Sequence, residues 1–144
     1  MAYSRKLERK IANLEKAFSN LHQSQFFDYE FQVKAEVVTK RFEYTFEALW
    51  KTLKLFLNQE KGLECYSPTD CLKSAYQTGM IPEEYEQDFI RMVRKRNEIV
   101  HIYNEPVAHE IYNCIVPRFI EAIGTIVEKL KQQKSIDNNT WKHE

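Results

Sequence analysis

Residues 28–60, DYEFQVKAEVVTKRFEYTFEALWKTLKLFLNQE, decide the fold, because their apolar side chains recur every three or four positions. This spacing places them on one side of an α-helix. The stripe consists of Val38, Phe42, Thr45 or Phe46, Leu49, Leu53 and Phe56. Gly62 predicts the end of the helix. A helix of about 30 residues is about 45 Å long, more than a compact domain of this size needs, which predicts a kink or an end packed on a second copy of the chain.

Further helices are expected on both sides of this stretch. The expected helices span about residues 4–25, 28–60, 68–79, 82–104 and 106–133. Ser67 followed by Pro68 is a typical helix start, and Pro117 predicts a kink in the last helix. The sequence therefore predicts an all-α protein, an antiparallel up-and-down bundle of about five helices around a four-helix core. A single domain is expected over residues 1–134, followed by a frayed tail over 135–144.

The composition excludes several classes of protein. With 21 basic and 21 acidic residues the chain carries no net charge, which argues against packaging of nucleic acid. Seven glycines and prolines (3 Gly, 4 Pro) are too few for sandwiches, barrels or glycine-rich phosphate loops. No run of 18 apolar residues predicts a membrane helix, and no apolar leader core is present, so we expect a cytoplasmic protein. Its three cysteines, Cys65, Cys71 and Cys114, are expected to be free thiols.

The helix expected after Pro82 interrupts its own apolar stripe. The apolar positions of this stripe are Tyr85, Phe89, Met92, Ile99 and Tyr103, and the position between Met92 and Ile99 is Arg96. A guanidinium group on a core-facing stripe needs an acceptor, an aromatic face or a wet groove, because it cannot lose its charge. Arg96 is therefore the residue around which a functional site is expected.

Residues 96–103, RNEIVHIY, contain four polar groups of different chemistry within eight positions. These are the guanidinium of Arg96, the amide of Asn97, the imidazole of His101 and the phenol of Tyr103. Such a group suits work on a phosphodiester, since Arg96 can hold two phosphate oxygens and His101 can accept or donate a proton near neutral pH. No metal or cofactor is needed, and none is expected. The alternative is structural: Arg96 pairs with a carboxylate of the long helix, Glu43 or Glu47, and His101 caps a helix end.

The spacing of Arg96, Asn97, His101 and Tyr103 resembles the motif of HEPN domains. Residues 41–54, RFEYTFEALWKTLK, look like the second-helix signature of one branch of that family, the nucleotidyltransferase substrate-binding proteins. The resemblance covers about residues 4–133. It implies a homodimer of helical bundles that works with a minimal nucleotidyltransferase and binds RNA or a nucleotide.

The resemblance also implies roles for these residues. In active members the shared cleft is a metal-independent endoribonuclease toxin, in which Arg96 and His101 would be the catalytic pair and Asn97 would orient them. The partner transferase of such members attaches AMP to the tyrosine two residues after the histidine, here Tyr103. The alternative is a non-catalytic subunit that binds nucleotide or another substrate for the transferase.

Two further features bear on the site. Glu43 and Glu47 lie one helical turn apart, and we expect them to support the site or to hold a cation rather than to catalyse. On a regular helix Arg96 and His101 point about 140° apart. Their convergence on one phosphate therefore needs a loosened helix, long side chains that wrap around a groove, or a dimer mate that supplies one of the two.

Overall fold

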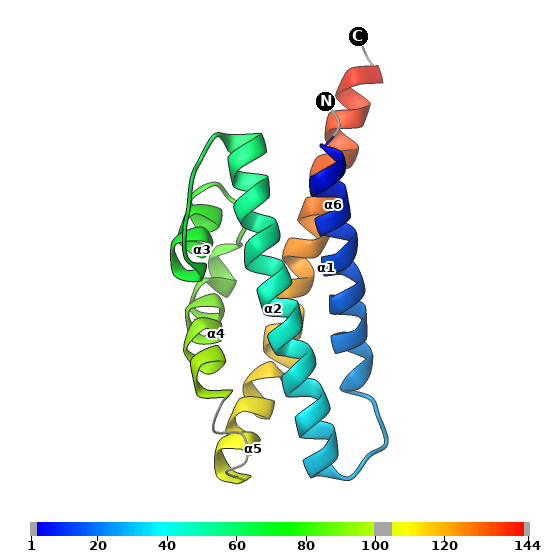
Figure 1. Ribbon diagram of the computed structural model, residues 1–144, viewed down its shortest axis with the longest axis vertical. Coiled ribbons are helices and arrows are strands. Elements are labelled where there is room, and N and C mark those ends of the chain that lie inside the picture. Colours follow the sequence, from blue (N-terminus) through cyan, green and yellow to red (C-terminus); the bar gives the residue numbers. More distant parts are fainter. Residues whose placement is uncertain (1–2, 100–104, 143–144) are drawn as a thin grey trace.

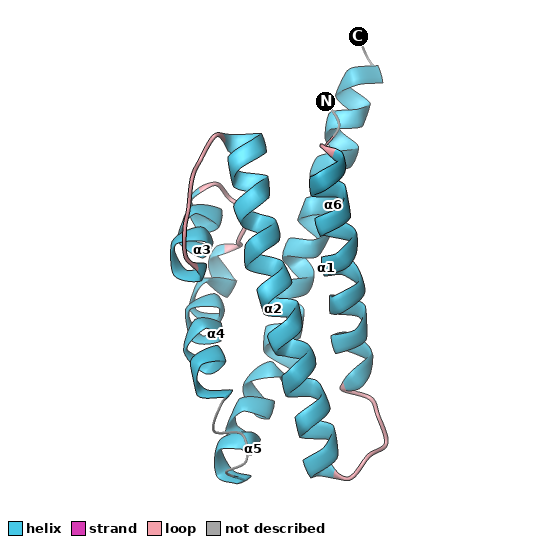
Figure 2. Cartoon of the chain, in the orientation of Figure 1, coloured by secondary structure: helices cyan, strands magenta, loops and turns pink. Residues whose placement is uncertain are grey.

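The computed structural model describes residues 3–99 and 105–142, and every regular element in these ranges is helical (Figure 2). The α-helices are α1 (Arg5–Ser24), α2 (Phe31–Lys61), α3 (Pro68–Gln77), α4 (Glu86–Glu98), α5 (Glu105–Cys114) and α6 (Ile120–Lys142). A 3₁₀ turn, η1 (Glu83–Tyr85), precedes α4, and a π-helical turn, η3 (Ile115–Phe119), joins α5 to α6. Successive long segments run in opposite directions (Figure 1). The predicted helical bundle is confirmed.

Local sequence signals set several helix ends. The Ser4 hydroxyl accepts a hydrogen bond from the Leu7 amide at 3.1 Å and begins α1. Ser67 caps α3 in the same way, with Pro68 at its first position. Gly62 ends α2 with φ of 66°, a left-handed conformation that glycine adopts without strain. These three starts and stops agree with the sequence predictions.

Helix α2 is the central element of the bundle. Its apolar stripe is buried, with Phe42, Phe46, Leu49 and Leu53 fully shielded from solvent. Along one side it packs on α1, and along the other the shorter α3, α4 and α5 follow one another (Figure 1). Helix α2 is one continuous α-helix from Phe31 to Lys61. The helix is long because a series of short helices lies along it.

Threonine hydroxyls mark the close approach of α1 and α2. The buried Thr45 donates to the Ala17 carbonyl of α1 at 3.1 Å. About two turns of helix farther on, Thr52 reaches the Lys10 carbonyl at 3.4 Å. Both hydroxyls also bond within α2, which satisfies them in the buried seam. This close contact brings the lysines of α1 near those of α2.

The last expected helix is divided at Pro117. Val116 has extended dihedral angles, φ −108° and ψ 119°, because a residue before proline is disfavoured in the helical region. The predicted kink is thus a break between α5 and α6. Helix α6 continues to Lys142 rather than ending near 133. None of the described helices has the length and apolar character needed to cross a membrane.

The expectation of three free thiols is wrong for two of the cysteines. Cys65 and Cys71 form a disulfide, with their Cα atoms 5.1 Å apart. The segment after α2 folds back against the start of α3, which brings the two residues together. Cys114 is free and buried. The spacing of Cys65 and Cys71 matches no zinc signature, and the path of this segment brings them into a disulfide.

Candidate functional site

Arg96 of α4 lies where its stripe meets α2. Its neighbours on the stripe, Met92 and Ile99, are buried, while the Arg96 side chain is 31% exposed. The guanidinium forms an ion pair through Nη2 with Glu47 Oε1. Its central carbon lies 5.9 Å from the centre of the Phe46 ring. The cation has therefore found both an acceptor and an aromatic face, the two partners that its position required.

Glu47 connects Arg96 to two further groups of α2. Its second oxygen, Oε2, accepts a hydrogen bond from Trp50 Nε1 at 3.1 Å and lies 3.8 Å from Lys51 Nζ. Two cations and one indole N–H thus surround one carboxylate. Both oxygens of Glu47 are engaged within the protein, which suits a role in holding Arg96 in place.

The other predicted site residues are placed differently. Glu43 lies one turn before Glu47 but pairs with Lys40 at 3.1 Å, an interaction that raises the pKa of Lys40. Asn97 follows Arg96 and is exposed. His101 and Tyr103 lie outside the described residues, so their predicted roles stay predictions, as does the way Arg96 and His101 would converge. Of the two carboxylates considered from the sequence, the structure brings Glu47 to Arg96.

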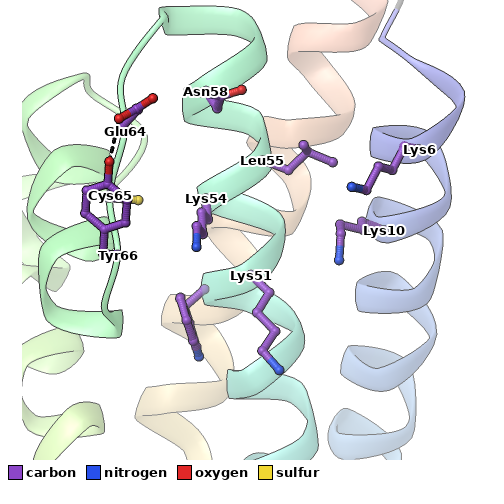
Figure 3. Close-up of a pocket in the computed structure, with 10 residues that line it drawn as sticks. Lys6, Lys10, Lys51, Lys54, Leu55, Asn58, Glu64, Cys65 and Tyr66 are labelled. Atoms are coloured by element: carbon purple, nitrogen blue, oxygen red, sulfur yellow. Dashed lines mark hydrogen bonds between the residues drawn. The ribbon is translucent and has the colours of Figure 1, made fainter.

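A hollow of about 450 Å³ lies between α1, α2 and the segment after α2 (Figure 3). Its charged and aromatic lining consists mainly of Lys6, Lys10, Lys51, Lys54, Trp50 and Tyr66. We call this hollow the lysine pocket. In Figure 3 the side chains of Lys6 and Lys10 extend from α1 toward α2. This pocket was missed by the sequence reasoning.

The positive charge of the lysine pocket is poorly balanced. Glu64 is the carboxylate in its lining, and it already accepts a hydrogen bond from the Tyr66 hydroxyl, which raises the tyrosine pKa. Lys54 Nζ lies 5.8 Å from the centre of the Tyr66 ring. Lys6 and Lys10 have no carboxylate within ion-pair distance among the described residues. The pocket is therefore a candidate site for an anion.

A sequence signal for this pocket did exist. Lys6 and Lys10 are four residues apart, and Lys51 and Lys54 are three apart, so each pair shares one face of its helix. Basic pairs of this kind are common on solvated faces. Only the packing of α1 on α2 brings the two pairs to one hollow.

Within residues 3–99 and 105–142 no three His, Cys, Asp or Glu side chains gather as metal ligands. His109 stacks on Phe31 with ring centres 4.0 Å apart, and His22 lies among Phe18 and Phe26. These described histidines are aromatic packing partners.

Residues 5–132 match a protein-family model described as "Nucleotidyltransferase substrate binding protein like". The chain belongs to this family. The family name implies association with a nucleotidyltransferase. It is also the branch that the stretch 41–54 resembles.

Two solved structures are similar to this chain. One is a protein from Thermus thermophilus, 33% identical with a TM-score of 0.75, and the match covers 81% of this chain and 98% of that one. The other, from Haemophilus influenzae, is described as revealing the fold of a substrate binding domain of a nucleotidyltransferase. It is 20% identical with a TM-score of 0.67, over 84% of this chain and 98% of that one, so it shows the fold alone. A comparison with curated proteins gave no match.

Proposed function

We propose that this protein is a non-catalytic subunit that binds a nucleotide substrate for a nucleotidyltransferase. The family and the description of the Haemophilus influenzae structure support a binding role beside such an enzyme. The observation that carries the proposal is the ion pair of Arg96 with Glu47 at the contact of α4 and α2.

This ion pair suits binding better than turnover. A guanidinium group has five N–H donors, and Glu47 engages Arg96 through Nη2, which leaves donors for a phosphate group. The carboxylate holds Arg96 in one orientation, so less freedom is lost when a phosphate binds. No described residue beside Arg96 is free to act as a proton acceptor, since Glu47 is itself held by Arg96, Trp50 and Lys51.

The competing prediction from the HEPN resemblance is a metal-independent endoribonuclease. It requires His101 as the proton carrier beside Arg96, and its control requires AMP transfer to Tyr103. Both residues lie outside the described part of the chain, and no described contact favours cleavage over binding. The same set of variants tests both functions.

The test measures nucleotide binding by calorimetry, with ATP as the probe, for the purified full-length protein alone and together with its transferase. Arg96→Ala is expected to weaken binding about tenfold, the effect of one lost charge-assisted hydrogen bond. The matched control is Arg94→Ala, an exposed arginine of the same helix, which should leave the affinity unchanged.

RNA cleavage is measured in EDTA with the same samples. Absence of cleavage together with Arg96-dependent ATP binding supports the binding subunit. Cleavage by the wild-type protein that disappears in both Arg96→Ala and His101→Ala would instead establish the ribonuclease. The proposal also fails if the wild-type protein binds no nucleotide in either setting.

A further inference from the structure

We propose that the lysine pocket binds the phosphate chain of a nucleoside triphosphate, with the base stacked on Trp50 or Tyr66. The inference rests on the proposed function and adds to it the place and the chemical class of the ligand. No family description assigns this pocket a role.

The charge of the pocket calls for a polyanion. Four lysine side chains face one hollow, and the carboxylate in its lining, Glu64, is occupied by Tyr66. The chain as a whole has 21 basic and 21 acidic residues, so this excess is local rather than a property of the protein. Ammonium groups that line one hollow in excess of the carboxylates repel one another, and a bound anion relieves that repulsion.

The number of charges favours a triphosphate over a single phosphate. Together with Arg96, the four ammonium groups stand against two carboxylates, Glu64 and Glu47, which leaves an excess of about three positive charges for a ligand to balance. A phosphate monoester would leave at least one lysine unmatched. Lysine also suits this task as a compact point charge on a flexible stem, which can follow successive phosphates.

Shape and aromatic lining favour a nucleotide over an inorganic polyphosphate. A volume of about 450 Å³ is typical of pockets that bind small ligands. Tyr66 is 72% exposed, so its ring offers a face that the protein does not cover. Stacking of a base on such a ring contributes to binding and is available to every nucleobase.

Glu47 places the lysine pocket next to Arg96. Its carboxylate contacts Arg96 on α4 and, through Oε2, Trp50 and Lys51 of the pocket lining. When a bound phosphate group attracts Lys51, Glu47 loses that ion pair and keeps its contacts with Arg96 and Trp50. The two regions therefore share one carboxylate, although different side chains reach the ligand.

The experiment compares the affinities of ATP, ADP, AMP and tripolyphosphate for the full-length protein. The variants are Lys6→Gln with Lys10→Gln, and Lys51→Gln with Lys54→Gln. The matched control is Lys61→Gln with Lys73→Gln, two exposed lysines outside the pocket. Tyr66→Ala tests stacking with little risk to folding, since this side chain is largely exposed.

We expect wild-type affinity to rise from AMP to ATP, and each pocket variant to weaken ATP binding at least about tenfold. In the pocket variants the affinity should rise less from AMP to ATP than in the wild-type protein, because the lysines contact the added phosphates. Tyr66→Ala should weaken ATP binding and leave tripolyphosphate binding unchanged. The control pair should behave as wild type.

Several results would overturn the inference without touching the proposed function. ATP binding that depends on Arg96 but not on the pocket lysines places the nucleotide elsewhere. Tighter lysine-dependent binding of single-stranded RNA than of ATP makes the pocket part of a polynucleotide groove. If the wild-type protein binds neither ATP nor tripolyphosphate, alone or with its transferase, both the ligand assigned to the pocket and the proposed function are wrong.

Discussion

Two basic regions lie along α2, and they differ in how many protein partners their positive charges have. Arg96 has a carboxylate, Glu47, and an aromatic ring, Phe46, as partners. The lysine pocket has four ammonium groups and one carboxylate in its lining, Glu64, which Tyr66 already engages, and Lys51 also pairs with Glu47. A cation beside a carboxylate and an aromatic ring is stable without a ligand, whereas a local excess of cations is more stable with a bound anion. The comparison distinguishes a cation that the fold holds in place, with N–H donors left for a ligand, from cations whose charge the protein balances only in part.

The two regions are also held together differently. Packing supports Arg96, since the Phe46 ring below it is fully buried. A covalent bond supports the pocket, since Cys65 in its wall is joined to Cys71 of α3. Substitutions in each region should therefore act through different forces.

The largest effect is expected from Phe46→Ala, which removes the ring beneath Arg96. Loss of a fully buried phenylalanine leaves a cavity and should lower the free energy of unfolding by about 4 kcal/mol. Urea denaturation measures this loss. Tyr44→Ala, an exposed aromatic position two residues earlier, is the control and should cost about 0.5 kcal/mol or less. Equal losses in the two variants would contradict the buried role of Phe46.

The double variant Cys65→Ser with Cys71→Ser should lower the free energy of unfolding by about 2 kcal/mol, the chain-entropy expectation for so short a loop. Urea denaturation of the oxidised wild-type protein gives the reference. A reducing agent should destabilise the wild-type protein by a similar amount and leave the variant unchanged. If the reducing agent has no effect on the wild-type protein, the bond does not support the pocket wall.

Glu47→Gln should cost about 1 kcal/mol, because Arg96 and Lys51 lose their carboxylate while Trp50 keeps an oxygen acceptor. Glu43→Gln removes only the surface pair with Lys40 and should cost about 0.5 kcal/mol or less. Chemical denaturation at moderate ionic strength measures both. A larger loss for Glu43→Gln would show that the wrong carboxylate has been assigned to Arg96.

The smallest effect is expected from Lys6→Gln with Lys10→Gln in the absence of ligand. Because no described carboxylate pairs with Lys6 or Lys10, the free energy of unfolding should stay within about 0.5 kcal/mol of wild type. At low ionic strength the variant should be slightly more stable, because repulsion in the pocket is relieved and less screened. Thermal unfolding at low and high ionic strength measures this. A clear loss of stability would show that these lysines are structural.

Much of the fold was predictable because the signals are local. The repeat through Phe42 and Leu53 predicts α2, and Gly62 predicts its end, from neighbouring residues alone. The position of Pro117 predicts the break in the last helix, although the extended Val116 makes it sharper than a kink. Length alone was a poor guide to α2, since it did not reveal that several short helices share one side of it.

The candidate site was predictable in part. Arg96 was identified because a charged residue stands on an apolar stripe, and this violation is visible in the sequence. Glu43 and Glu47 were equivalent at that stage, since both lie on the same face of one helix. The position of α4 along the axis of α2 places Arg96 beside Glu47 rather than Glu43. This position cannot be predicted from the sequence of either helix alone.

The sequence by itself therefore determined the helices, their apolar faces and the need of Arg96 for a partner, because periodicity and helix ends act over a few neighbouring residues. Tertiary structure alone decided that Glu47 is the partner and that Cys65 bonds to Cys71. It also brought the lysines of α1 and α2 around one hollow. These contacts depend on how packed helices are rotated and staggered against each other, which is settled by the whole core at once.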